Sequence, residues 1–224
     1  MKAATIDGRP IAWQTIDWSR HHAVVLRKHV GSGGSYDTIE VADPAFSYAW
    51  NALNSQGLAN VGNGLRDLAP ANWTTDIIPT IQRECATIGD VRSYLSTIGG
   101  QYQIGVNIAV FDATGRVRDF EIGPSRFWEY DPEHAQRQTQ SFFQPPKLFV
   151  TRANRSFRND QQQEIDSVVD TWDADDSKRR YRTARDLFVK YITNGDRLTI
   201  GEAANITRWG DPGLGSRSIS GPHT

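Results

Sequence analysis

Ile104-Gly105-Val106-Asn107-Ile108-Ala109-Val110-Phe111-Asp112 is the stretch of this sequence with the clearest strand pattern. Its apolar residues alternate with smaller or polar ones closely enough to favour a β-strand. Ala113-Thr114-Gly115-Arg116 then reads as a turn, and Val117 to Ile122 as the returning strand. The sequence therefore predicts a small antiparallel β-hairpin over residues 104–122.

Helical spacing is found on both sides of this hairpin. Asp43-Pro44 resembles a helix start and predicts a helix that ends near Gln56-Gly57. A second apolar stripe predicts a helix over residues 75–97, and similar spacing recurs over 161–173 and 175–195. Because helical stripes outnumber strand patterns, the predicted fold class is mainly α: a helical bundle with a small antiparallel β-hairpin and long loops.

The domain organisation follows from the same pattern. Residues 1–41 are interpreted as an N-terminal extension, 42–206 as the bundle domain, and 207–224 as a C-terminal tail. Within the bundle, residues 123–160 form a predicted long loop, which in a compact domain is usually functional or disordered. The segment Phe127-Trp128-Glu129-Tyr130 is aromatic within this polar loop and is predicted to make subunit contacts.

Composition restricts the class of protein. A chain of 224 residues can form one sizeable domain, and its formal net charge of −1 provides no global attraction for nucleic acid. Cys85 is the only cysteine, which excludes an internal disulfide framework and a multi-cysteine zinc site. No apolar run approaches the roughly 20 residues of a membrane helix, so no membrane partner is expected.

A charged helix is predicted near the C-terminal end. Asp175 and Asp176 precede five basic residues between Lys178 and Arg185, and apolar residues recur behind them at helical spacing. Carboxylates suit a helix N-terminus, and Arg179 and Arg182 near its start could bind phosphate. The alternative interpretation is a solvated charged face.

Four landmarks resemble those of tobamovirus-type coat proteins, the subunits of rod-shaped RNA viruses, and occur in the same order. They are Ala42-Asp43-Pro44 with Asn51-Ala52-Leu53, Phe111-Asp112 with Arg116, Asp175-Asp176 with Arg182-Thr183-Ala184, and the tail Ser220-Gly221-Pro222-His223-Thr224.

The resemblance implies a non-enzymatic viral coat protein, with a bundle of the tobamovirus type, that assembles into a helical rod around single-stranded RNA. It implies a homo-oligomer located in the virion and the host cytoplasm, with no cofactor and no metal. The implied RNA-binding residues are Arg116, Asp175, Asp176, Arg179, Arg182 and Thr183.

Two alternatives remain open. One is a metal-dependent nuclease or toxin that uses the aspartates of residues 166–176, because carboxylates bind Mg²⁺. The other is a phage head or tail subunit that makes no nucleic-acid contact. The five histidines show no paired metal spacing, and the sequence contains neither a G-x-S-x-G elbow nor a P-loop.

Overall fold

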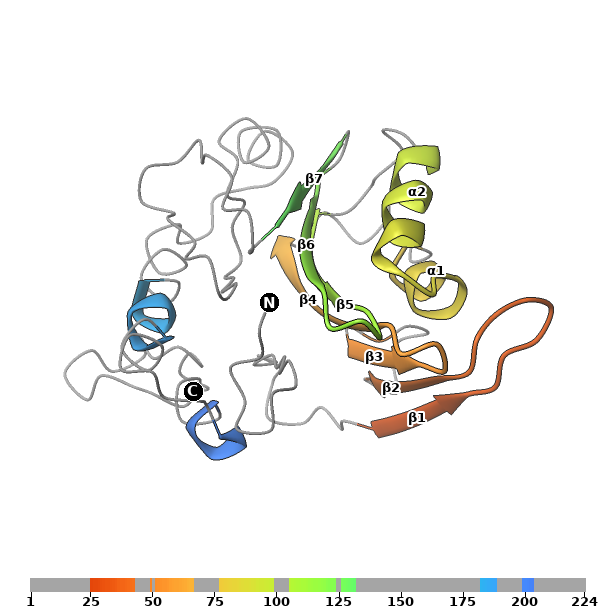
Figure 1. The fold of residues 1–224 in the computed structure, drawn as a ribbon, viewed down its shortest axis with the longest axis horizontal. Coiled ribbons are helices and arrows are strands. Elements are labelled where there is room, and N and C mark those ends of the chain that lie inside the picture. The colour runs from red at the N-terminus through yellow and green to blue at the C-terminus, as the bar shows by residue number, and fades with distance from the viewer. Residues whose placement is uncertain are drawn as a thin grey trace.

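A computed structural model describes residues 25–42, 49, 51–66, 77–98, 105–123, 126–131, 182–188 and 199–203. Its central feature is a seven-stranded antiparallel sheet in which neighbours along the chain are neighbours in the sheet (Figure 1). The strands are β1 (Val25–His29), β2 (Thr38–Ala42), β3 (Asn51–Asn54), β4 (Ala59–Arg66), β5 (Gly105–Phe111), β6 (Val117–Ile122) and β7 (Phe127–Tyr130).

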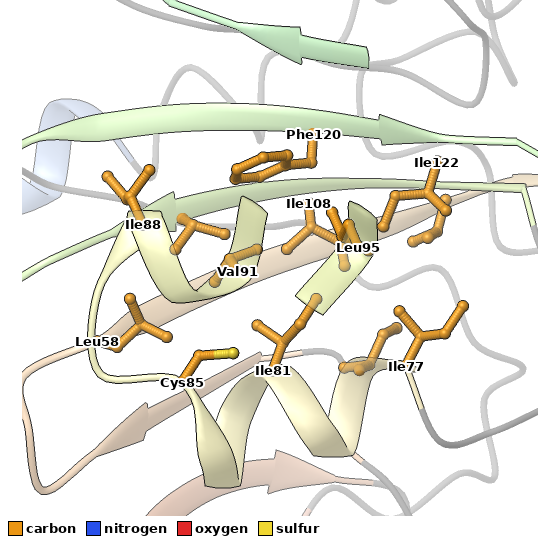
Figure 2. Close-up of a cluster of buried hydrophobic side chains, with 13 residues drawn as sticks. Leu58, Ile77, Ile81, Cys85, Ile88, Val91, Leu95, Ile108, Phe120 and Ile122 are labelled. Carbon is orange, nitrogen blue, oxygen red and sulfur yellow. The ribbon is translucent and has the colours of Figure 1, made fainter. Parts of the chain in front are cut away.

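Two helices, α1 (Ile77–Glu84) and α2 (Ile88–Ile98), lie against one face of the sheet (Figure 1). Between helices and strands lies an apolar core, shown in Figure 2. Strand alternation supplies its sheet side: Ile108 on β5 and Phe120 and Ile122 on β6 are fully buried there. Cys85 is buried in the same core, as expected for a small apolar residue.

The predicted mainly α helical bundle is wrong, because the described part of the chain is organised around a sheet. The predicted hairpin is present as β5 and β6, and it lies inside this larger sheet. Residues 51–54, predicted as helix, form β3, which pairs with β2 on one side and β4 on the other. Pairing on both sides outweighs the local helix signal, since the propensity of so short a segment is a weak determinant.

The single helix predicted over 75–97 is two helices separated at Cys85. The Asn54 side-chain amide donates to the carbonyl oxygens of Gln82 and Cys85 and so satisfies the end of α1. Thr87 and Asp90 then exchange hydrogen bonds in a capping box that starts α2. Neither α1 nor α2, nor any other helix of the described residues, has the length and apolar character needed to span a bilayer.

A buried carboxylate ties the first strand and the first helix to the sheet. Glu40 on β2 is inaccessible to solvent and accepts hydrogen bonds from Arg27 on β1 at 2.9 Å and Arg83 on α1 at 2.9 Å. Burial acts to raise the pKa of Glu40, but the bonds from Arg83, Arg27 and Thr38 outweigh burial and lower it.

The predicted domain organisation, with boundaries after residues 41 and 206 and a long loop over residues 123–160, stays a prediction. β1 and β2 belong to the same sheet as β3 to β7, and residues 127–130 of the predicted loop form β7. The predicted helix over 161–173 lies outside the described residues.

Candidate functional site

The face of the sheet opposite the helices carries a row of polar positions across its last three strands. The register pairs Asn107 with Glu121, and Glu121 with Trp128. Directly opposed residues in antiparallel strands have Cβ atoms about 4.5–5.5 Å apart. The row therefore runs without interruption from β5 to β7.

A second row lies beside the first. Asp119 on β6 is opposite Ala109 on one side and Tyr130 on the other. Asp119 and Glu121 are two residues apart on one strand, so both project from the same face. We call Asn107, Asp119, Glu121, Trp128 and Tyr130 the polar row.

The polar row is largely buried. Asp119 is 0% and Glu121 2% exposed, and Asn107 and Tyr130 are also buried. Removing a carboxylate from water costs several kcal/mol unless hydrogen bonds or opposite charges compensate, so fully buried acidic side chains are uncommon. Asp119 and Glu121 place two such carboxylates on one face of a short strand.

The rest of this face has the opposite character. Ile39 on β2 and Leu53 on β3, which are opposite each other in the register, are 51% and 49% exposed. They line an open groove of about 680 Å³, which we call the apolar groove. Its lining is Ile39, Val41, Asn51, Ala52, Leu53, Gly57, Ala59, Asn60, Val61, Phe111, Asp112, Ala113 and Gly115.

The apolar groove adjoins the polar row. Val61 lines the groove and is opposite Ala109, which in turn is opposite Asp119. Two strand spacings separate Val61 from Asp119, a distance of ~10 Å. One surface thus combines buried acidic and amide groups with an adjacent apolar hollow, the usual composition of a small-molecule site.

Asp112 closes the groove at the β5–β6 turn. Its carboxylate accepts hydrogen bonds from the backbone N–H of Thr114 at 3.0 Å and from the Arg116 side chain at 2.8 Å. Burial acts to raise the pKa of Asp112, but the hydrogen bonds from Thr114 and Arg116 lower it overall. Asp112 is therefore an anchored turn residue, and Gly115 at φ 79° completes this turn.

The structure does not bring the six predicted RNA-binding residues together as one described site. Arg116 lies at the β5–β6 turn, is 54% exposed and forms an ion pair with Asp112 at 2.8 Å. Arg182 and Thr183 lie in the helical residues 182–188. Asp175, Asp176 and Arg179 lie outside the described residues, as do the aspartates of 166–176. Their RNA-binding role stays a prediction.

No member of the polar row was among the site residues predicted from the sequence. Asp119 and Glu121 alternate with the apolar residues Phe120 and Ile122 inside a predicted strand, which is a detectable signal for two carboxylates on one face. Trp128 and Tyr130 were instead assigned to subunit contacts. They belong to β7 and take their place in the row only through its register with β6.

Comparison with known proteins assigns neither a family nor an activity to this chain. No protein-family model matches the chain, and no curated protein matches it. Two solved structures of conjugated bile acid hydrolase variants from Clostridium perfringens are similar to it. They are 13% and 14% identical, with TM-scores of 0.46 and 0.48, and each alignment covers 86% of this chain and 72% of the hydrolase.

These findings correct the predicted identity and function. The observed seven-stranded sheet has no counterpart in the predicted bundle of the tobamovirus type, so the tobamovirus resemblance and the coat function are wrong. The prediction of a non-enzymatic protein rested on that resemblance and is overturned with it. The nuclease and phage-subunit alternatives have no support either.

Four predictions of the overturned interpretation stay untested. They are single-stranded RNA as partner, a homo-oligomer, the absence of membrane contact, and a location in the virion and host cytoplasm. With TM-scores this low, the likeness to the hydrolases does not itself assign an activity to this chain.

Proposed function

We propose that this chain is a hydrolase whose acid–base chemistry takes place at the polar row. The observation that carries the proposal is the pair of buried carboxylates, Asp119 and Glu121, on the same face of β6. Carboxyl groups placed by a rigid strand and shielded from solvent are suited to proton transfer.

Glu121 is the better placed of the two for activating water. It occupies the centre of its row, with the amide of Asn107 on one side and the indole of Trp128 on the other. An amide N–H donor beside a general base can stabilise the oxyanion that forms when water attacks a carbonyl carbon.

Asp119 can serve as the general acid that protonates the leaving group. It lies one row away from Glu121, at a spacing of about 7 Å along the strand, and Tyr130 lies opposite it. At this spacing the two carboxyl groups are separate enough to take different roles. One group can then accept the proton of water while the other protonates the leaving group.

The apolar groove suits the part of the substrate that does not react. Its lining side chains Ile39, Leu53 and Phe111 are available on the same face as the row. Contacts of this kind orient a substrate without taking part in the chemistry.

The test is a hydrolysis assay of the purified chain against a panel of amides and esters, which includes a conjugated bile acid. Glu121→Gln and Asp119→Asn should each reduce kcat by about 10²–10⁴. Glu84→Gln, which changes an exposed carboxylate on α1, is the matched control and should retain full activity. Wild-type turnover of no compound, or unchanged kcat in both site variants, would contradict the proposal.

A further inference from the structure

The strand that supplies Trp128 and Tyr130 has few contacts of its own with the sheet. β7 contains four residues and, among the described strands, pairs only with β6. Short edge strands held by one neighbour are among the less stable parts of a sheet. Its side chains need further contacts if they are to keep a fixed geometry in the polar row.

These contacts lie on the other face of β7. Phe127 and Glu129 alternate with Trp128 and Tyr130 and so project toward the helices. The Phe127 ring packs against Phe120 with 6.2 Å between ring centroids. Glu129 receives two hydrogen bonds from Arg92 of α2, both 2.6 Å long, in a bidentate ion pair.

A second arginine extends this ion pair along β7. The guanidinium of Arg118 on β6 lies 3.3 Å from Glu129 and 2.7 Å from Asp131, the residue that follows the strand. Arg118 is only 15% exposed, and its carboxylate partners are 20% and 14% exposed. We call Arg92, Arg118, Glu129 and Asp131 the ionic clamp.

We infer that the ionic clamp positions Trp128 and Tyr130 in the polar row from the opposite face of the sheet. A slip of β7 by one residue would turn Glu129 away from Arg92 and move Trp128 to the helix side. The bidentate geometry with Arg92 therefore specifies the register and orientation of β7. This inference rests on the proposed function of the row, and Arg92 is a positioning residue that touches no substrate.

The clamp should act locally, without a large effect on global stability. Arg92 is 50% exposed, and ion pairs this accessible contribute little to global unfolding. Losing the pair should instead loosen β7, which keeps its ladder with β6, the Phe127 contact and the ion pairs of Arg118.

The experiment compares Arg92→Ala and Arg92→Lys with Arg83→Ala, which removes an ion pair from α1 to β2 at the other end of the sheet. Amide hydrogen exchange of residues 127–130 reports on β7. Fluorescence compared with and without Trp128→Phe isolates the Trp128 contribution among seven tryptophans.

Arg92→Ala should raise the amide hydrogen exchange rate of β7 about fivefold and shift the Trp128 component of the fluorescence. The exchange rate of β5 should be unchanged. Arg92→Lys, which keeps the charge but loses the bidentate bond, should lie between Arg92→Ala and wild type. Arg83→Ala should act through global stability alone, so it should leave the Trp128 component at the wild-type value and should not raise β7 exchange relative to β5 exchange.

Wild-type β7 exchange and an unshifted Trp128 component in Arg92→Ala would overturn the inference, as would an equal effect of Arg83→Ala. Neither readout requires a substrate. A failure of the clamp is therefore distinguishable from a failure of the hydrolase proposal, which the kcat values of the Glu121→Gln and Asp119→Asn variants decide.

Discussion

The two faces of the sheet differ in a way that separates folding from function. The helix-covered face buries an apolar core, as Ile108, Phe120 and Ile122 show (Figure 2). Its buried polar side chains, Glu40 and Asn54 among them, hold α1 to the sheet through hydrogen bonds. On the opposite face the buried residues include Asp119 and Glu121, whereas Ile39 and Leu53 are about half exposed. The first face follows the rule for a stable core. The second face departs from this rule twice, because it buries two carboxylates and exposes two aliphatic side chains. Such departures are typical of functional surfaces.

Adjacent residues on β6 give the largest expected contrast. Phe120→Ala removes a fully buried ring from the helix-covered face and should reduce the free energy of unfolding by about 3–5 kcal/mol. Glu121→Gln should change it far less, because it keeps the volume and polarity of the side chain. Urea denaturation of both variants measures the difference. An equal loss in Glu121→Gln would make Glu121 a structural residue.

Polar residues on the helix-covered face should prove structural. The Asn54 side chain donates to Gln82 and Cys85 and accepts from the backbone N–H groups of Gln56 and Leu58. Asn54→Ala should therefore cost about 3 kcal/mol, since several buried backbone groups lose their partner.

The matched control for Asn54→Ala is Asn51→Ala, on the same strand but the other face, where Asn51 accepts one long bond of 3.4 Å from Gly62. Its cost in denaturation experiments should stay below about 1 kcal/mol. Comparable losses in the two variants would remove the distinction between the faces.

Glu40 should make the helix-covered side sensitive to acid. Its pKa is lowered in the folded protein, so its stabilising effect is present above the ordinary value of 4.5 and is lost as pH falls through the folded pKa. Glu40→Gln should cost about 2 kcal/mol at neutral pH, because Arg27 and Arg83 lose a charged acceptor. Denaturation at a series of pH values should show a shallower acid slope for this variant, and parallel slopes would refute the assignment.

The smallest effect is expected in the apolar groove. Ile39→Thr keeps a β-branched side chain at a half-exposed position and should change stability by about 0.5 kcal/mol. Ile108→Thr, the same change in the buried core, should cost several times more. If thermal denaturation shows similar losses of stability in Ile39→Thr and Ile108→Thr, the groove is part of a packed interior.

Local signals predicted part of the fold correctly. Alternation in residues 104–122 located β5 and β6 to within a residue or two, and the helical stripe before it located α1 and α2. The interruption at Cys85 was not predicted. Thr87 and Asp90 mark the start of α2 locally, but the end of α1 depends on Asn54, which lies on a distant strand. The helix expected before Gln56 was wrong because pairing with β2 and β4 decides the state of residues 51–54.

The candidate site was harder to predict than the fold. The sequence alone determined that Asp119 and Glu121 share a face, because strand periodicity is local. Only the tertiary structure decided that this face lies away from the helices and that Asn107, Trp128 and Tyr130 join the two carboxylates. The physical reason is that register depends on pairing between strands and on contacts such as Arg92 with Glu129, which no periodicity within one segment encodes.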